Sequence, residues 1–201
     1  LANICIKHNI IIVSDEIHSD ITFKKFTPLA SISKDIANRT ITLNSAGKTF
    51  NIAGLNSAYA ISKNQKILDK FKKIAQKREI QSINFFGYVS TKAAYDNGAL
   101  FVEELKKYLL SNIEFTKNYL KKNNSKIDFK PPEATYLLWL DFSRYNLSHN
   151  EIKNILLTKS KIALNDGVSF GNNGNEYFRL NLALSQNSLE IALSQLSKEF
   201  L

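Results

Sequence analysis

The sequence predicts an α/β fold followed by a small α+β domain, and three observations support that prediction. Two short apolar runs, residues 10–13 and 40–43, each end in polar residues, as strands buried in a sheet do. Amphipathic helical patterns separate and follow these runs. After Pro131 and Pro132 the pattern changes to short strands and helices. We therefore expect three parts: residues 1–89, a long interdomain helix over 90–125, and a small domain over 126–201.

The first part contains the strands of the predicted sheet. Residues 1–9 end a helix, with Ile4 facing inward, and lead into the strand over residues 10–13, which is expected to be buried on both faces. The strand over 40–43 follows, and residues 54–62 have the small and β-branched content of a third strand. Because ligands of open α/β sheets bind beyond the carboxyl ends of the strands, we expect a site where these strands end.

Helical periodicity dominates the middle of the chain. It extends from Asn64 to about Arg78, and a long helix is predicted from about Ser90 to Lys122, with Gly98 as its weak point. The small domain is predicted to contain a strand over 134–142, a helix from Ser148 to Thr158 with a capping box at Glu151, strands over 161–166 and 177–184, and a helix over 187–201.

The composition is that of an ordinary globular chain, with 44% apolar and 22% charged residues among 201. Cys5 is the only cysteine, which excludes an internal disulfide and a cysteine-built metal site and favours a cytoplasmic setting. No apolar run approaches the roughly 20 residues that cross a bilayer. The net charge of +9 comes with no nucleic-acid-binding motif, so neither nucleic acid nor a membrane is expected as a partner. Because the sequence has no methionine, we expect it to be the C-terminal portion of a longer protein.

The segment Gly47-Lys48-Thr49 looks like the end of a phosphate-binding P-loop. That motif requires a glycine five residues before Gly47, and this position is Thr42. No glycine occurs anywhere before Gly47, so the backbone N–H cradle for a nucleotide's phosphates cannot form. A nucleotide site of this kind is therefore excluded.

A second interpretation makes Lys48 the covalent residue of a pyridoxal 5′-phosphate (PLP) site. Such a site needs a lysine amine and a carboxylate for the pyridine nitrogen. Asp15 and Lys48 each follow an apolar strand, so both are expected at one edge of the sheet. Ser45 offers a hydroxyl to a phosphate, and Arg179 interrupts an apolar strand where a carboxylate partner is expected. Each feature is common by itself, so an ordinary surface lysine stays open on spacing alone.

Six segments together carry a family resemblance. In chain order they are KHNIIIVSDEIHSDI (7–21), SAGKTFNIAGL (45–55), INFFGYVSTKAAY (83–95), ATYLLWLDF (134–142), KIALNDGVSFG (161–171) and EYFRLNLAL (176–184). On these segments the chain resembles the C-terminal portion of fold-type-I PLP-dependent enzymes, aminotransferase class I/II. It is most similar to their cystathionine β-lyase (C–S β-lyase) branch, which includes the maltose-regulon modulator. The resemblance implies the end of a PLP-binding large domain, with a mostly parallel sheet, and a small α+β C-terminal domain.

The resemblance also implies roles for single residues. Lys48 would bind the cofactor covalently, Asp15 would pair with the pyridine nitrogen, and Ser45 would bind the phosphate. Arg179 would bind the α-carboxylate of an amino-acid substrate. His18 stands where many aminotransferases carry a tyrosine that hydrogen-bonds the cofactor's phenolic oxygen, so either that role or a structural one is expected.

The implied activity is elimination of a thiol from a sulfur-containing amino acid to give pyruvate and ammonia. An aminotransferase would use the same residues and is the first alternative; a non-catalytic, regulatory protein-binding role is the second. The resemblance further implies a homodimer for the full-length protein. Since the family's other cofactor contacts precede Leu1, we expect this chain alone to be inactive and to bind PLP poorly.

Other conspicuous residues are given structural roles. His149 is expected at the surface and Trp139 in the core at the centre of its strand. Asp166 and Gly167 are expected first to form a turn, with a place in the lining of the substrate pocket as the alternative. The family more often carries serine or alanine where Gly47 stands, so the loop before Lys48 is expected to be looser here.

Overall fold

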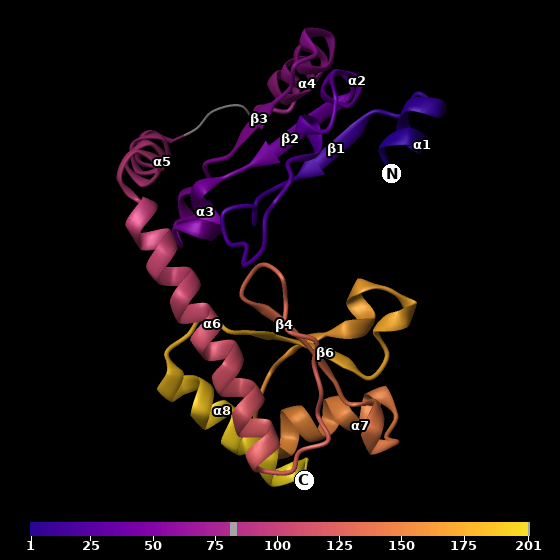
Figure 1. The fold of residues 1–201 in the computed structure, drawn as a ribbon, viewed down its shortest axis with the longest axis vertical. Helices are drawn as coiled ribbons and strands as arrows, with labels where there is room; N and C mark the ends of the chain where they lie inside the picture. The colour runs from indigo at the N-terminus through magenta and orange to yellow at the C-terminus, as the bar shows by residue number, and fades with distance from the viewer. Residues whose placement is uncertain (81–83, 201) are drawn as a thin grey trace. The chain divides into compact units, whose positions relative to one another are not determined.

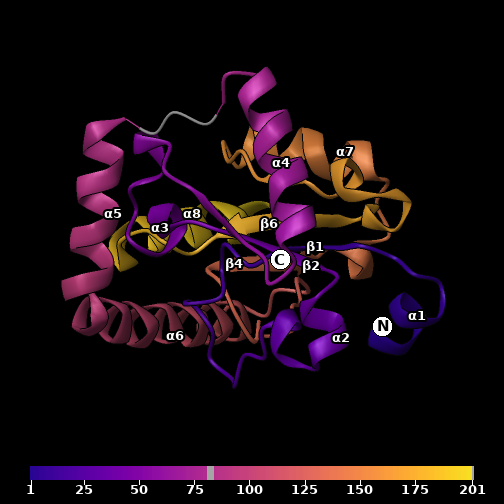
Figure 2. The same ribbon diagram turned by 90° about the horizontal axis from the view of Figure 1, so that it is seen from above.

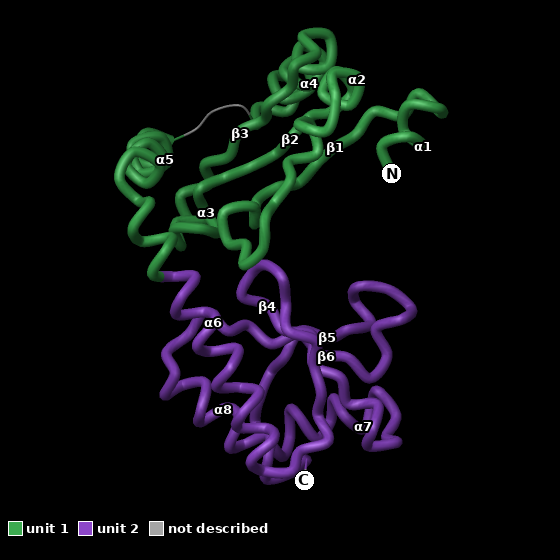
Figure 3. The backbone as a smooth tube through the Cα atoms, in the orientation of Figure 1, with its two compact units in different colours: residues 1–104 green, residues 105–201 purple. Residues whose placement is uncertain are grey.

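The computed structural model describes residues 1–80 and 84–200, which form two units, Leu1–Glu104 and Leu105–Leu201 (Figures 1 and 3). The helices are α1 (Ala2–Lys7), α2 (Lys34–Ala37), α3 (Ala46–Thr49), α4 (Gln65–Lys77), α5 (Phe85–Asn97), α6 (Ala99–Lys122), α7 (His149–Asn154) and α8 (Gln186–Glu199). The strands are β1 (Ile12–Asp15), β2 (Thr40–Asn44), β3 (Tyr59–Ile61), β4 (Leu137–Asp141), β5 (Asn165–Asp166) and β6 (Tyr177–Asn181). The predicted α/β fold class is confirmed.

The sheet of the first unit has the strand order β1-β2-β3. β1 and β2 are parallel, with Ile12 opposite Thr40 and Asp15 opposite Leu43, whereas β3 runs antiparallel to β2. The parallel pair brings the carboxyl ends of β1 and β2 to one edge, as the sequence predicts.

The prediction that the first strand is buried on both faces is wrong. Ile12 is only 8% exposed and packs with Cys5 and Ile36, but Val13 is 64% exposed. Successive side chains of a strand point to opposite faces, so β1 buries one face only. The other face stays uncovered by the described residues.

The prediction for α1 is wrong by one position. Cys5, not Ile4, faces the cluster of buried side chains, and Ile4 is 58% exposed. Adjacent residues on a helix differ in direction by about 100°, so a shift of one position changes the buried residue.

The long helix predicted over residues 90–122 is two helices, α5 and α6, which meet at Gly98. A Cβ on Gly98 would collide with the Phe50 ring and with the Ala94 carbonyl oxygen. Phe50 follows α3, and its ring also packs against Tyr95 and Phe101 at centroid distances of 5.8 and 5.9 Å. Within the first unit α3 lies beside α5 (Figure 2). The break at Gly98 thus makes room for the aromatic ring of the residue that follows α3.

The second unit packs helices on one face of a small antiparallel sheet of order β4-β6-β5 (Figure 1). Side chains of this covered face include Leu138, Leu140, Phe178 and Leu180, all buried. Trp139 points to the other face and is only half-buried, so its predicted place in the core is wrong. That outer face also carries Arg179.

The capping box predicted for the second unit is present, and the strand predicted before β6 is shorter than expected. The Ser148 hydroxyl accepts a hydrogen bond from the Glu151 N–H, and a Glu151 carboxylate oxygen accepts one from the Ser148 N–H, so the capping box is confirmed. α7 continues into a π-helical turn, Ile155–Lys159. The strand predicted over 161–166 is shorter, because only Asn165–Asp166 pairs with β6. In the described part of the chain, no helix combines the length and apolarity that a membrane span requires.

Candidate active site

Asp15 lies at the edge of the first unit's sheet where β1 and β2 end. It is the last residue of β1, is exposed, and stands opposite Leu43 in the parallel ladder. One of its carboxylate oxygens accepts a hydrogen bond from the Ile17 N–H at 3.2 Å. β2 ends one residue after Leu43, so Ser45 and Lys48 follow at the same edge.

The Ser45 hydroxyl is already engaged by the protein. It caps α3 by accepting a hydrogen bond from the Gly47 N–H at 2.9 Å, and it donates to the Ser57 carbonyl oxygen at 2.5 Å. Ser45 would therefore have to release Ser57 before it could donate to a phosphate. The Gly47 N–H is also used, because it donates to this hydroxyl.

Lys48 is exposed on a helical turn whose neighbouring residues are buried. Gly47 and Thr49 flank it, and both are buried. A Cβ on Gly47 would lie 3.1 Å from the Cα of Ala53, so this glycine permits close packing, a role that the sequence did not predict. Lys48 is thus the exposed residue of a packed turn that follows β2.

The turn after β1 is tied to the start of α3 by side chains that the sequence did not single out. The Asn44 amide donates to the Ser19 hydroxyl at 3.1 Å, and the Thr49 hydroxyl donates to an Asp20 carboxylate oxygen at 3.0 Å. His18 lies in this turn and is half-buried. The polar segment that follows the first strand is the only signal that could have indicated these links. They bring the Asp15, His18 and Lys48 segments together.

Two tyrosines lie near this region. Tyr59 is paired with Asn44 across the β2–β3 ladder, and its hydroxyl is 3.0 Å from that of Tyr95 on α5. Burial, followed by the hydrogen bond to Tyr59, raises the pKa of Tyr95 above its ordinary value. The Tyr95 phenol therefore stays neutral at physiological pH.

Arg179 belongs to the second unit, whereas Asp15, His18, Ser45 and Lys48 belong to the first. On β6 it stands between Trp139 of β4 and Asn165 of β5, each directly opposite in its ladder. Its Nη2 donates to the Asn165 side-chain oxygen at 3.1 Å, and its Cζ lies 4.7 Å from the centroid of the Phe170 ring. The Arg179 Nε is buried and has no hydrogen-bond partner among the described residues.

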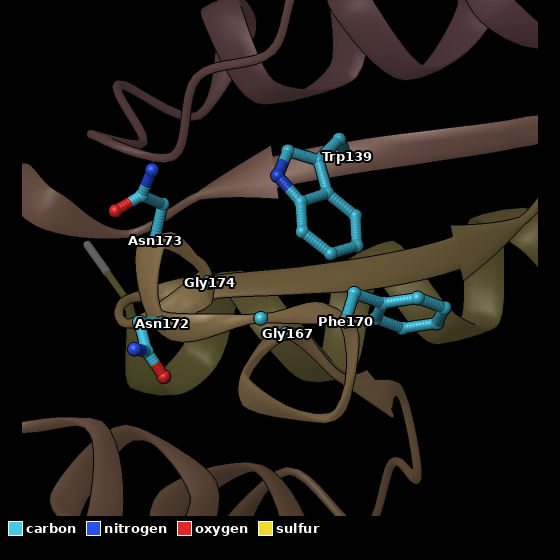
Figure 4. A pocket seen from close by; sticks show the side chains of 7 residues that line it. Trp139, Gly167, Phe170, Asn172, Asn173 and Gly174 are labelled. Carbon is cyan, nitrogen blue, oxygen red and sulfur yellow. The ribbon is translucent and has the colours of Figure 1, made fainter.

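A pocket of about 500 Å³ lies between β4 and the loop that follows β5 (Figure 4). Trp139 and Phe170 form its aromatic part, with ring centroids 5.4 Å apart in an edge-to-face arrangement. Gly167 and Gly174 pack so closely that a Cβ on either would collide with the backbone of the other. Phe170 thus both lines the pocket and contacts the Arg179 guanidinium.

Where a turn was predicted, Asp166 ends β5 and caps the short 3₁₀ helix Gly167–Phe170, and His149 is not a surface residue. Its side chain is 15% exposed, its ring stacks on Phe178 at 4.9 Å, and its Nε2 lies 2.8 Å from an Asp166 oxygen. Asp166 also accepts hydrogen bonds from Lys153 at 2.8 Å and from the Val168 N–H at 3.0 Å. The Lys153 hydrogen bond contributes most to lowering the pKa of Asp166.

The family model for aminotransferase class I and II matches residues 1–196. The chain belongs to the aminotransferase class I and II family. It is 35% identical over 198 residues to the cystathionine β-lyase PatB of Bacillus subtilis strain 168, covering 98% of this chain and 51% of that protein.

Solved structures agree with the family assignment. A PLP-bound protein from Clostridium difficile 630 is 45% identical with a TM-score of 0.93, over 97% of this chain and 51% of that one. Cystalysin from Treponema denticola, which contains PLP, is 29% identical with a TM-score of 0.94, over 98% and 50%. The chain therefore spans about half the length of the relatives that it matches. No group of three or more His, Cys, Asp or Glu side chains in residues 1–80 and 84–200 is arranged to hold a metal ion.

Proposed function

We propose that the full-length protein is a PLP-dependent C–S β-lyase, which releases a thiol from a sulfur-containing amino acid and forms pyruvate and ammonia. The observation that supports it most is the placement of the Lys48 amine and the Asp15 carboxylate at one sheet edge. The chain's similarity to a cystathionine β-lyase favours elimination of a thiol over other reactions at such a site.

The side chains at this edge fit PLP chemically. An exposed lysine amine is accessible to an aldehyde, and an exposed carboxylate pairs with a protonated pyridine nitrogen. Ser45 fits less directly, because its hydroxyl must leave Ser57 to bind a phosphate. We assign Lys48, Asp15, Ser45 and His18 to cofactor binding, where His18 would donate to or accept from a polar group of the cofactor. When bound, PLP supplies an electron sink for negative charge at the substrate Cα.

The chain's own residues then have distinct tasks. Arg179 binds the α-carboxylate and orients the amino acid. The Lys48 amine would hold the cofactor and, when free, would accept the proton from the substrate Cα. Asp15 keeps a proton on the pyridine nitrogen, which favours charge withdrawal from Cα. With a sulfur leaving group at Cβ, loss of the thiol follows.

An aminotransferase is the second candidate, and the family match supports it. Lys48, Asp15 and Arg179 would perform the same tasks. In amino transfer, Lys48 would give the proton back, and no thiol would be lost from Cβ. Pocket shape, not this set of residues, distinguishes the two reactions.

The test is a pair of assays on the full-length protein, with cystathionine for pyruvate release and with amino donors plus a keto acid for amino transfer. We expect pyruvate release, and a loss of about a hundredfold to ten-thousandfold in Lys48→Ala. Lys63→Ala, at another exposed lysine of the first unit, is the matched control and should retain activity. Amino transfer without pyruvate release would contradict the lyase proposal and favour the aminotransferase. If the protein shows neither activity, both enzymatic proposals are contradicted and the regulatory, protein-binding role is favoured.

Cofactor retention gives a readout that does not depend on turnover. After borohydride reduction, mass spectrometry should find the pyridoxyl group on Lys48 of the full-length protein and none in Lys48→Ala. The 201-residue chain alone should retain little PLP and show no activity. We also infer a cytoplasmic homodimer, which fractionation and sedimentation of the full-length protein test.

A further inference from the structure

The Arg179 guanidinium is held from two directions by residues of its own unit. Asn165 accepts a hydrogen bond from Nη2 at 3.1 Å, and Phe170 lies under the planar group at 4.7 Å from Cζ. Asn165 is directly opposite Arg179 in the β5–β6 ladder, so the backbone register fixes this contact. Phe170 belongs to the loop closed by the tight approach of Gly167 and Gly174.

This arrangement leaves the Nε of the guanidinium without an acceptor. The Nε is buried, yet no described residue accepts its hydrogen bond. A buried donor without a partner costs free energy, so its presence indicates an acceptor that arrives from outside. A carboxylate is suited to this donor, because it accepts short, charge-assisted hydrogen bonds from a guanidinium N–H.

The residues of β5 keep the charge of Arg179 available for such a ligand. Asn165 is a neutral acceptor, so it orients the guanidinium without neutralising it. The adjacent Asp166 is a carboxylate, but successive strand residues point to opposite faces, and it bonds to Lys153 instead. The order Asn-Asp in this strand therefore places the neutral group beside Arg179.

We propose that Asn165 and Phe170 are positioning residues that hold the Arg179 guanidinium to receive the single carboxylate of an amino acid. The inference rests on the proposed function, which assigns the substrate carboxylate to Arg179. Asn165 fixes the rotation of the group and preserves its charge, while Phe170 fixes its plane. Both act through Arg179 and need not touch the substrate.

The decisive variant is Asn165→Asp, which keeps an acceptor at this position but adds a competing negative charge. Asn181→Asp is its matched control: Asn181 lies two residues from Arg179 on the same face of β6, and its side-chain oxygen accepts from the Ala183 N–H at 2.8 Å, as an aspartate also would. Phe170→Leu removes the aromatic face and keeps an apolar side chain.

The experiment follows the arginine Nε–H signals of the 201-residue chain by NMR, assigned with Arg179→Lys, during titration with L-alanine. Ethylamine, which has no carboxylate, is the control ligand. We expect a saturable shift of the Arg179 signal with L-alanine only. Asn165→Asp should raise the apparent Kd about tenfold. Asn181→Asp should raise it less than about twofold, because solvent screens an exposed charge without direct contact. Phe170→Leu should raise it about threefold.

The outcomes separate this inference from the proposed function. If L-alanine does not shift the Arg179 signal in the unaltered chain, both the carboxylate role of Arg179 and this inference are overturned. If it does, but Asn165→Asp binds as tightly as Asn181→Asp, only the positioning role is overturned. In the full-length enzyme, Asn165→Asp should raise KM more than it lowers kcat; equal KM values in the two variants would also overturn it.

Discussion

The two units differ in how completely they bury their own apolar side chains. Most of the buried apolar residues lie in the second unit, whereas most of the exposed large apolar side chains lie in the first. Leu138 and Leu140 on β4 are fully buried beneath helices, but Val13 on β1 is 64% exposed and Ile61 on β3 is 59% exposed. The second unit thus has a core of its own, and the first has a sheet with uncovered apolar surface.

The better packed unit is therefore not the one that carries the predicted covalent residue. The first unit carries Lys48 and Asp15, yet it is the less completely packed of the two. Apolar surface of this kind is typical of an interface with further polypeptide. Because the matched relatives are about twice as long, we expect the rest of the full-length protein to cover it.

The largest expected effect comes from separating the units. Residues 99–201, which keep α6 intact, should unfold cooperatively with dispersed NMR signals, because the second unit buries its own core. Residues 1–98 should bind the dye ANS and lack a cooperative transition, because their apolar faces are uncovered. The 201-residue chain is the reference. A sharp, reversible melt of residues 1–98 would contradict the comparison.

Truncation of one strand residue in each unit tests the same difference in side-chain burial. Leu138→Ala should lower the free energy of unfolding of the second unit by about 2–5 kcal/mol, since it leaves a cavity in a packed core. Ile61→Ala should change the free energy of unfolding of the 201-residue chain by less than about 0.5 kcal/mol, since its side chain is mostly exposed. Chemical denaturation followed by circular dichroism gives both values. Equal losses would show that the sheet of the first unit is better covered than its exposure indicates.

Two glycines, one in each unit, differ in how closely other atoms pack against them. A Cβ on Gly167 would collide with the carbonyl oxygens of Tyr177 and Gly174, whereas nothing lies within 4 Å of a Cβ on Gly54. Gly167→Ala should destabilise the second unit by about 1–3 kcal/mol through overpacking. Gly54→Ala should be neutral or stabilise by about 0.4–1 kcal/mol, because it restricts the unfolded chain. Thermal melts of both variants test the pair, and tolerance of Gly167→Ala would mean that this loop relaxes freely.

Local signals in the sequence were enough to predict much of this structure. Helical spacing located α4 and α8, and the Ser148 capping box located α7. The edge that carries Asp15 and Lys48 followed from two consecutive apolar strands. Each of these features depends on neighbouring residues in the chain.

Contacts between distant residues could not be predicted in the same way. The helix break at Gly98 depends on the ring of Phe50, the residue that follows α3. The bond from Arg179 to Asn165 depends on the register of a two-residue strand, too short for a periodic signal. Side-chain exposure likewise depends on which elements cover a face, so the burial of Val13 was predicted wrongly.

The smallest expected effect is electrostatic and lies in the second unit. The hydrogen bond from Lys153 contributes most to lowering the pKa of Asp166, so this carboxylate stabilises the fold fully above its unfolded pKa of about 3.9. That stability is lost as pH falls through the lower folded value. Between pH 5 and 2 the melting temperature should therefore fall less in Asp166→Asn, which retains the cap on the Val168 N–H, than in the unaltered chain. Asp128→Asn is the control, because its ion pair with Arg144 is more than half exposed and solvent screens it. An equal change in both variants would mean that the Asp166 cluster, despite its half-buried partner His149, behaves as ordinary surface charge.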